Sequence, residues 1–219
     1  DEIINRGLKV VWDYRGRVNG IDEESIKRFK NSGGRMISFG IETASEEGLR
    51  VLRKGSKLKQ NIEALRLCKK YGIVTIADFI IGLPHERSYD DVLKSIKTLT
   101  YDYRPDYAQF SILSLYPNTE IYDQAVAKGL IEDGKWNEWA RDPLNAKLKV
   151  EHWHEFISFD QLVELQKKSY RIFYLRPTSI WNMIKQLRSF DEFKIKVKAA
   201  LDILGINFKF GTFKLINML

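Results

Sequence analysis

The segment Asp78–Pro84 constrains the fold more than any other part of the chain. It reads Asp-Phe-Ile-Ile-Gly-Leu-Pro, an apolar run that starts with a carboxylate, breaks at Gly-Leu-Pro and follows the helical pattern of residues 61–71. A second apolar run, Met36–Ser45, includes Glu42 near its end. Apolar runs that alternate with helical segments are typical of parallel strands buried on both faces. The sequence therefore predicts an α/β fold with polar residues at the carboxyl ends of parallel strands.

The same alternation continues through the first 130 residues. The expected strands are Leu8–Asp13, Met36–Glu42, Ile73–Ile81 and Tyr107–Leu115. Helices are expected to begin at the acids Asp22–Glu24, which suit the helix dipole, at Ser45, and at the capping residue Ser88. A longer helix is expected from Leu58, with apolar positions Ile62, Leu65 and Leu67. Four strand–helix units suit right-handed crossovers but cannot close an eight-stranded barrel. We therefore expect an open, curved parallel sheet.

Composition is that of a folded domain with an appendage. Hydrophobic residues make up 44% of the chain and charged residues 30%. No apolar stretch approaches the roughly 20 residues that span a bilayer, and no signal peptide is visible. The single cysteine, Cys68, excludes an internal disulfide framework and suits a reducing compartment. These features predict a cytoplasmic protein.

The pattern changes after Gly129. We expect residues 1–130 to form the α/β domain, residues 131–158 to form a linker that contains tryptophans, and residues 159–219 to form a helical extension. The tryptophans of this linker are Trp136, Trp139 and Trp153. Two helices are expected in the extension, over residues 159–174 and 180–204.

The net charge of +7 comes mostly from residues 160–219. Apolar stripes and basic residues alternate there, which is typical of a helix that meets a membrane surface or an acidic partner, but also of one that packs on its parent domain. We favour packing. Nucleic-acid binding is not expected, because the basic residues lack interleaved aromatics. His152 and His154 have no third ligand nearby in the sequence, so we expect no metal site there.

Five short motifs occur in order between about Gly7 and Pro177. They are Trp12–Arg15, Phe39–Ala44, Leu52–Gly55, Phe79–Pro84 and Phe173–Pro177. Together they resemble the carboxyl-terminal half of the radical S-adenosylmethionine (radical SAM) enzyme core, most closely its cobalamin-binding subgroup. This resemblance implies a partial, open TIM-type (β/α) barrel, of which residues 1–130 would be the second half, followed by an α-helical extension.

The resemblance also implies binding roles. Glu42 and Asp78 would accept hydrogen bonds from the ribose hydroxyls of S-adenosylmethionine (SAM), and Lys54 or Arg53 would meet its carboxylate. Structural interpretations remain open. Glu42 could cap the helix that begins at Ser45, Asp78 is costly to bury without a partner, and Lys54 could belong to a solvated basic helix face.

Four further residues belong to the expected site. Gly82 and Pro84 form a tight loop whose backbone would pass close to the adenine. Arg15 and Ser114 lie near the ends of other strands and would line the substrate side, although Arg15 could instead only pair with an acid. These roles, too, are implied by the resemblance.

One departure from the family pattern concerns a turn. Relatives have Pro-Gly-Thr after the later strand, and this chain has Pro117-Asn118-Thr119. Asparagine tolerates a positive φ angle better than other non-glycine residues. We therefore expect the turn to survive.

The chain lacks the C-x3-C-x2-C motif with which the family holds a four-iron, four-sulfur cluster. One thiolate, that of Cys68, cannot hold such a cluster. We expect the chain to be a fragment, inactive alone, whose missing amino-terminal half carries the cluster. The alternatives are a degenerate, non-catalytic scaffold and a basic module that binds nucleic acid or a membrane surface.

The whole protein is expected to cleave SAM reductively at the cluster. It would produce a 5′-deoxyadenosyl radical or, with cobalamin, transfer a methyl group. The implied partners are the amino-terminal half, an unknown small-molecule substrate and a reductant such as ferredoxin or flavodoxin. The cofactors carry the hard chemistry in such enzymes, and this half would contribute binding contacts and part of the substrate cavity.

Overall fold

The computed structural model describes residues 1–141, 150–185, 189, 191, 195 and 198. The chain divides into two compact units, Asp1–Gln166 and Lys167–Leu219. The domain boundaries that the sequence suggested, near residues 130 and 158, stay a prediction.

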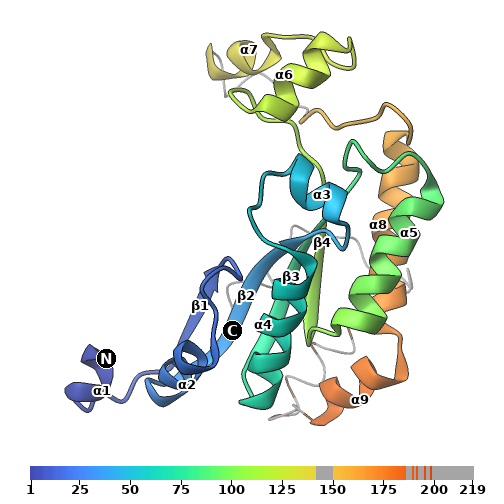
Figure 1. The fold of residues 1–219 in the computed structure, drawn as a ribbon. Coiled ribbons are helices and arrows are strands. Elements are labelled where there is room, and N and C mark those ends of the chain that lie inside the picture. The colour runs from blue at the N-terminus through green and yellow to red at the C-terminus, as the bar shows by residue number, and fades with distance from the viewer. Residues whose placement is uncertain (142–149, 186–188, 190, 192–194, 196–197, 199–219) are drawn as a thin grey trace. The chain divides into compact units, whose positions relative to one another are not determined.

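The first unit is built on a four-stranded parallel sheet whose order is β1-β2-β3-β4 (Figure 1). The strands are β1 (Trp12–Gly16), β2 (Gly34–Glu42), β3 (Val74–Ile81) and β4 (Tyr107–Ile112). Each strand pairs with its sequence neighbours, and helices connect them, as βαβ units require. The predicted α/β fold with an open parallel sheet is confirmed.

The helices of the described residues follow the expected alternation. They are α1 (Glu2–Asn5), α2 (Glu23–Asn31), α3 (Glu46–Val51), α4 (Leu58–Lys70), α5 (Tyr89–Thr98), the π-helix η1 (Leu99–Tyr103), α6 (Glu120–Ala127), α7 (Lys135–Arg141), α8 (Phe159–Tyr174) and α9 (Pro177–Lys185). The predicted cap at Ser88 is confirmed, because its side chain accepts a hydrogen bond from the Asp91 N–H in the first turn of α5. Asp22 and Ser45 cap α2 and α3 in the same way.

The sheet has one face in the core and one face that is less covered. Along β3, Ala77 and Phe79 are buried, whereas Ile76 and Asp78, which alternate with them, are only half-buried. Helix α4 packs on β3, and the Phe79 ring meets that of Phe110 edge-on at 5.9 Å between centroids. Burial of each such side chain contributes about 1.5–3 kcal/mol. Asp78 therefore stands on the face that the core does not use, whereas Thr75 is buried with Ala77 and Phe79.

The first predicted strand was wrong in position. β1 begins at Trp12 rather than Leu8, and Leu8 and Val11 are exposed. Because β2 begins only at Gly34, after the turn that ends α2, the residues before Trp12 have no partner on that strand. The last strand also ends earlier than expected, at Ile112.

Helix α4 presents a different face from the one expected. Ile62 is 42% exposed, whereas Asn61, Leu65 and Cys68 are buried. These three residues follow the three-to-four residue spacing of a helix face, and Ile62 falls beside it. Leu65 and Leu67 are buried, as expected.

The turn after β4 survives as predicted. Asn118 has a φ of 63°, in the left-handed region where glycine is common. Thr119 then caps α6 by accepting a hydrogen bond from the Tyr122 N–H.

In the second unit, a short network joins the end of α8 to the start of α9. The Arg176 Nε donates to the Ser179 Oγ at 2.5 Å, and this hydroxyl donates to the Phe173 carbonyl at 2.9 Å. The predicted helix over residues 159–174 is confirmed. Of the helix expected over residues 180–204, α9 covers the part up to Lys185, Asp191, Ile195 and Lys198 are also helical, and most of the basic stripes lie outside the described residues.

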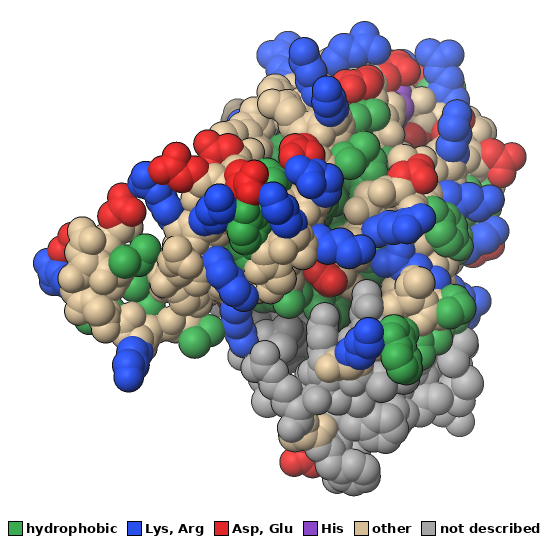
Figure 2. All heavy atoms as spheres, turned by 60° about the horizontal axis from the view of Figure 1, so that its bottom comes forward, with side chains coloured by type: hydrophobic (Ala, Val, Ile, Leu, Met, Phe, Trp, Pro, Cys, Tyr) green, Lys and Arg blue, Asp and Glu red, His purple; other side chains and the backbone are tan. Residues whose placement is uncertain are grey.

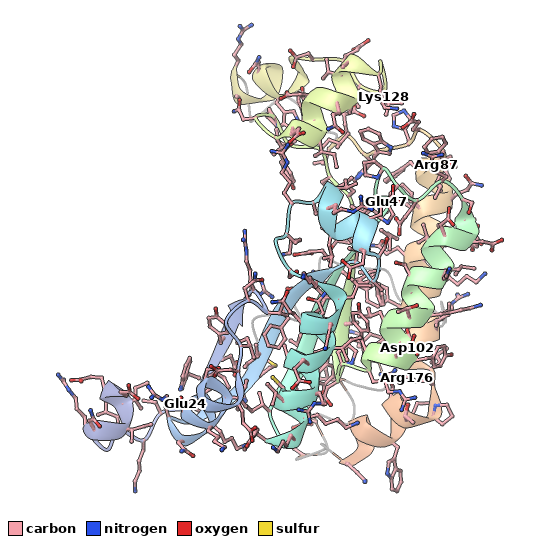
Figure 3. The ribbon with its side chains drawn as sticks, in the orientation of Figure 1. Glu24, Glu47, Arg87, Asp102, Lys128 and Arg176 are labelled. Atoms are coloured by element: carbon pink, nitrogen blue, oxygen red, sulfur yellow. The ribbon has the colours of Figure 1, made fainter. Side chains whose placement is uncertain are left out.

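The described surface carries charges of both signs. Figure 2 shows Lys and Arg side chains spread over one face, with Asp and Glu side chains among them. Lys128, which follows the end of α6 (Figure 3), pairs with Glu155 at 2.5 Å. No described helix is long and apolar enough to cross a membrane.

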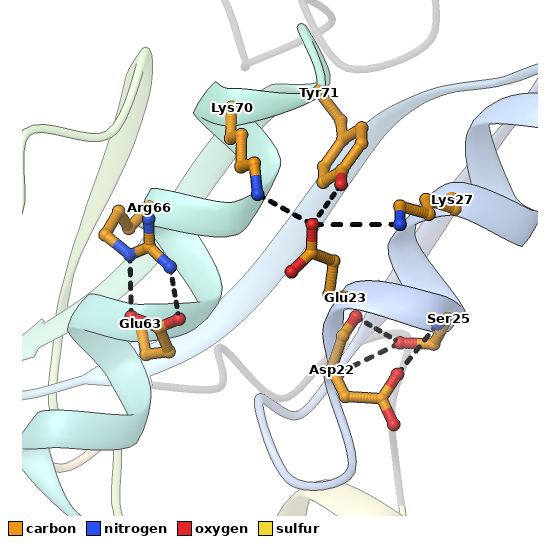
Figure 4. Close-up of polar contacts among 8 residues, drawn as sticks. All are labelled: Asp22, Glu23, Ser25, Lys27, Glu63, Arg66, Lys70 and Tyr71. Carbon is orange, nitrogen blue, oxygen red and sulfur yellow. Dashed lines mark hydrogen bonds and ion pairs between the residues drawn. The ribbon is translucent and has the colours of Figure 1, made fainter.

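One polar cluster ties α2 to α4 (Figure 4). The Glu23 carboxylate of α2 accepts hydrogen bonds from Lys70 at 2.7 Å and from the Tyr71 hydroxyl, and lies 3.8 Å from the Lys27 ammonium. The hydrogen bond from Lys70, with that from Tyr71, lowers the pKa of Glu23 to about 2. Helices from successive βαβ units are therefore joined through one carboxylate.

This cluster predicts acid sensitivity. Because the pKa of Glu23 is lowered in the folded chain, its contribution to stability is present above the usual value of 4.5 and is lost as the pH falls toward about 2. We expect Glu23→Gln to show a smaller loss of unfolding free energy over this range than the wild type, measured by urea denaturation. Glu47→Gln, at an exposed position on α3, is the control. Equal acid sensitivity in wild type and Glu23→Gln would contradict the assignment.

Candidate functional site

Glu42 ends β2 beside a lysine. The Lys54 Nζ lies 2.8 Å from the Glu42 Oε1, and the side chains are only 15% and 19% exposed, respectively. Glu42 has a φ of 63° and follows a shift in the register between β2 and β3. Such a bulge re-aims a side chain, and a positive φ costs a non-glycine residue about 1–2 kcal/mol. The backbone is strained where this carboxylate is presented.

Gly40 makes room for this ion pair. A Cβ atom at position 40 would lie 2.5 Å from the Glu42 Oε1 and 3.0 Å from the Lys54 Nζ. A larger residue would therefore displace both charged groups. Steric limits therefore explain why a glycine stands at position 40 of the Phe39–Ala44 motif.

Asp78, on the neighbouring strand β3, has one occupied and one free oxygen. The Ser38 hydroxyl donates to the Asp78 Oδ2 at 2.9 Å, and the Arg15 Nε lies 4.0 Å from the same oxygen. The Oδ1 is buried and has no hydrogen-bond partner among the residues that the structure describes. Leaving a buried polar atom unpaired costs about 1–3 kcal/mol. Asp78 therefore presents an acceptor that the chain itself does not use.

The strand register places these groups on one face. Arg15 is the partner of Ser38, and Gly40 is the partner of Asp78. Side chains of paired residues point to the same side of a sheet. The polar groups of three strands therefore meet on the less covered face, toward its carboxyl edge.

The structure distinguishes Arg53 from Lys54, the two basic residues that the sequence left open as partners of a ligand carboxylate. Arg53 is exposed and pairs with Glu120 of α6 at 2.5 Å. Lys54 is largely buried and pairs with Glu42. The basic side chains of Lys57 and Lys59 are exposed. Lys54 is therefore set apart from the solvated basic cluster.

Ser114 follows β4 and contacts another segment. It forms an isolated antiparallel bridge with His152, and its hydroxyl donates to the Ile112 carbonyl at 3.4 Å. The His152 Nδ1 lies 2.8 Å from the Leu113 carbonyl oxygen, and its ring stacks on Phe159. These contacts join Ser114 to the segment after residue 150, and no hydrogen bond or ion pair among the described residues joins it to Glu42 or Asp78.

The loop after β3 is held by a glutamate. Gly82 has a φ of 79°, which favours glycine, and the N–H groups of Gly82 and Leu83 donate to the Glu86 Oε2 at 2.8 and 2.9 Å. Pro84 follows and is half-buried. The loop therefore has a fixed conformation.

Glu86 is an unusual carboxylate. It is 3% exposed, and its Oε1 is buried without a partner. Burial raises the pKa of Glu86 to about 7, against the lowering effect of the N–H bonds from Leu83 and Gly82; the Asp91 charge adds to the increase. The carboxyl therefore changes charge near neutral pH.

The comparisons with known proteins concern the family and the fold of this chain. Residues 2–99 match the family model described as the radical SAM superfamily. This chain belongs to the radical SAM superfamily. Its sheet of parallel strands with connecting helices is the partial TIM-type barrel that the resemblance implied.

Curated relatives are longer than this chain. An uncharacterized methyltransferase of Pyrococcus horikoshii is 34% identical over 178 residues, which cover 80% of this chain and 36% of the relative. The anaerobic magnesium-protoporphyrin IX monomethyl ester cyclase of Rubrivivax gelatinosus is 32% identical over 126 residues, which cover 57% of this chain and 22% of the relative. The chain thus spans about a third or less of these relatives.

Solved structures show the same fold. The radical SAM methyltransferase TsrM of Kitasatospora setae, solved with cobalamin and a [4Fe-4S] cluster, has a TM-score of 0.52 and 20% identity, over 58% of this chain and 25% of that chain. Coproporphyrinogen III oxidase of Escherichia coli has a TM-score of 0.53 and 15% identity, over 76% of this chain and 32% of that chain. The alternatives of a non-catalytic scaffold or a nucleic-acid or membrane-surface module gain no support from these matches.

The described residues do not fit an iron–sulfur cluster. Cys68 is buried in α4, and burial raises the pKa of its thiol to about 12, so the thiolate that binds iron is disfavoured. Among the described residues there is no group of three or more His, Cys, Asp or Glu that could hold a metal. The free acceptor of Asp78 and the Glu42–Lys54 pair, by contrast, fit a polar organic ligand that carries hydroxyl and carboxylate groups.

Two residues of the site were missed in the sequence. Ser38 lies two residues before Gly40, so the two-residue period of a strand already places it on the same face. Glu86 gives no such signal, because an acidic residue after a turn is usually exposed. Its burial emerges only from the packed structure.

The raised pKa of Glu86 predicts a pH effect on stability. Folding favours the protonated carboxyl, so the stabilisation is complete below the usual value of 4.5 and is lost as the pH rises to about 7. The shift corresponds to at most about 3 kcal/mol. We expect the unfolding free energy of the wild type to fall relative to that of Glu86→Gln across this range, measured by urea denaturation. Parallel pH profiles for the two proteins would contradict a perturbed carboxyl.

Proposed function

We propose that this chain is the SAM-binding carboxyl-terminal part of a radical SAM enzyme of the methyltransferase or cyclase type. The observation that carries the proposal is the Asp78 Oδ1, a buried acceptor without a partner. Asp78 is paired with Gly40, and a Cβ atom at Gly40 would lie 2.5 Å from the Glu42 Oε1 and 3.0 Å from the Lys54 Nζ, so the ion pair is on the Asp78 side of the sheet. Membership of the radical SAM superfamily supplies the ligand class.

Each of these residues has a role in the proposal. Asp78 and Glu42 accept hydrogen bonds from the ribose hydroxyls, because carboxylates are acceptors only. Lys54 meets the SAM carboxylate as a cation, and Glu42 holds it there at 2.8 Å. Gly82 and Pro84 bring the loop backbone to the adenine side. The charges of the ligand are thus met by a pre-formed pair rather than by solvated side chains.

SAM supplies, when bound, the methyl or the 5′-deoxyadenosyl group that the reaction uses. The chain's own residues bind and orient it, and Arg15 and Ser114 line the substrate side. The iron–sulfur cluster is held by residues outside this sequence, since Cys68 does not fit. Cobalamin and a reductant such as ferredoxin or flavodoxin complete the proposal for the whole protein, and the methyltransferase relative from Pyrococcus horikoshii supports methyl transfer as the reaction class.

The free edge of β1 supports an amino-terminal partner segment. Among the described strands, β1 pairs only with β2 and lies at the edge of the sheet; Val11, just before β1, and Tyr14 within it are 73% and 42% exposed. An unpaired edge with apolar side chains is a template for a further strand. We propose that the amino-terminal half of the radical SAM core adds this strand.

Substitutions at the two carboxylates test the ligand site. We expect Asp78→Ala and Glu42→Ala each to weaken SAM binding about 10- to 100-fold, because a hydrogen bond to a charged group contributes about 1.5–3 kcal/mol. The measurement is titration calorimetry of the cluster-loaded longer protein. Asp102→Ala, at an exposed aspartate on η1 (Figure 3), is the matched control and should bind normally. Unchanged affinity in both site variants would refute the site.

Turnover tests the reaction class. We expect the reduced, cluster-loaded longer protein to convert SAM to S-adenosylhomocysteine or 5′-deoxyadenosine, detected by mass spectrometry, and the two carboxylate variants to do so more slowly at limiting SAM. Absence of both products from the wild type, with SAM bound, would refute the catalytic proposal and leave a binding scaffold.

The edge of β1 gives a separate prediction. In a longer protein that includes the amino-terminal half, we expect amide hydrogens of Trp12–Gly16 to exchange more slowly than in this chain alone, because a new strand would pair with them. Hydrogen–deuterium exchange followed by mass spectrometry measures this, with residues of β3 as the internal control. Equal exchange of β1 in both proteins would mean that its edge stays free.

A further inference from the structure

We propose that Gln109 is a specificity-determining residue that binds an uncharged, amide-type group of the substrate. The inference deepens the proposed function and rests on it, because it takes the sheet face that carries Asp78 as the place where SAM and substrate meet. Neither a motif nor a charge pattern marks Gln109 in the sequence. Its role follows from the register between β3 and β4.

The register puts Gln109 beside Asp78. The two residues are partners in the parallel pairing of β3 with β4, and paired side chains point to the same side of a sheet. The burial pattern agrees, because Ala108 and Phe110 are 4% and 1% exposed, whereas Gln109 between them is only half-buried. Neighbouring strands lie about 4.8 Å apart. A group that contacts Gln109 is therefore next to a ligand that Asp78 holds.

The Gln109 carboxamide is not used by the fold. Among the described glutamines, Gln109 forms no side-chain hydrogen bond, whereas each of the others does: Gln60, Gln124, Gln161 and Gln166. Gln166 shows the difference most directly, because its amide donates to the Phe110 carbonyl of the same strand at 2.8 Å. A carboxamide is both a donor and an acceptor. Gln109 thus keeps its hydrogen-bonding capacity for a group outside the described residues.

Apart from Asp78, the neighbours of Gln109 on this face of the sheet are uncharged. The alternation along β4 gives Tyr107 and Ser111, and these are the partners of Ile76 and Ile80 on β3. The other charged groups of the candidate site come from β1, β2 and the segment after α3. The β4 part of this face therefore suits a neutral ligand group with an apolar neighbour.

A charged group would bind poorly beside Gln109. The Asp78 carboxylate on the adjacent strand repels an anion, and Gln109 offers it no positive charge. A cation is attracted by Asp78, but in the proposed function the acceptors of Asp78 bind the ribose, and SAM brings its own positively charged sulfonium to this face. Burial of a charge without a partner is costly. A carboxamide or amide, by contrast, donates to and accepts from Gln109 without a net charge.

Three probes of one shape test this selectivity. Benzamide is neutral and both donates and accepts, benzoate is an anion that only accepts, and benzamidine is a cation that only donates. Each also carries a flat apolar ring, which suits the neighbouring Ile76 and Ile80. The measurement is a saturation-transfer NMR titration of the cluster-loaded longer protein with SAM present. We expect benzamide to bind at least about fivefold more tightly than the other two probes.

Substitutions of Gln109 should change this order of affinities. Gln109→Leu removes the hydrogen bonds, so we expect it to weaken benzamide binding about 5- to 10-fold and to abolish the preference. Gln109→Glu keeps the shape and adds a negative charge, so benzamidine should become the tightest of the three. Gln124→Glu, at an exposed glutamine on α6, is the matched control and should keep the wild-type order. Equal benzamide affinity in wild type and Gln109→Leu would overturn the proposal, as would no benzamide binding to the wild type at about 10 mM.

Calorimetry with SAM separates substrate selection from a role in binding SAM. We expect Gln109→Leu to bind SAM within about threefold of the wild type, since Asp78, Glu42 and Lys54 are unchanged. A loss of SAM affinity as large as that of Asp78→Ala would put Gln109 in the SAM site and overturn its role in substrate selection. If thermal denaturation shows that Gln109→Leu is unfolded, Gln109→Met, which has a similar length and no amide, replaces it.

The outcomes also separate this inference from the proposed function. A wild type that binds no SAM would refute the proposed function, and a titration without SAM would still compare benzamide binding between wild type and Gln109→Leu. A wild type that binds SAM but shows no preference among the three probes would refute the selectivity of Gln109 alone.

Discussion

The parallel pairing of β2 with β3 is the constraint on which the candidate site depends. Its register puts Gly40 opposite Asp78 and leaves Ser38 within hydrogen-bond distance of the same carboxylate. A slip of one residue would turn Asp78 into the helix-covered core and bring Phe79 to the polar face. Phe39 and Phe79, both buried, oppose that slip through the apolar surface that it would expose.

Three features of the candidate site each lower the stability of the folded chain. Glu42 has a positive φ, and Asp78 and Glu86 each keep one buried oxygen without a partner. Each feature costs on the order of 1–3 kcal/mol, which the packed core must offset. Such costs concentrate where geometry serves a ligand rather than the fold. Three of them lie near the carboxyl ends of adjacent strands and the loop that follows, which marks this edge more clearly than any single motif does.

Local rules predicted most of the fold, and distant contacts supplied the rest. The caps at Asp22, Ser45 and Ser88 were predictable because each side chain bonds to its own helix. The start of β1 was not, because it depends on where β2 begins. The sequence marked Glu42 and Asp78 by motif. The 2.8 Å contact between Glu42 and Lys54, however, joins residues that lie twelve positions apart, on either side of α3. Burial of Glu86 required the whole loop.

The Glu42–Lys54 pair explains how two charged side chains can be kept in a largely buried position. Removing a carboxylate and an ammonium from water costs several kcal/mol per ion unless they are paired. Because the Lys54 ammonium and the Glu42 carboxylate already contact each other, in the proposed function a ligand carboxylate shares Lys54 and ligand hydroxyls use the remaining acceptors of Glu42 without a second desolvation of either group. Gly40 leaves room for the Glu42 carboxylate and the Lys54 ammonium, so this uncharged residue allows the ion pair to form.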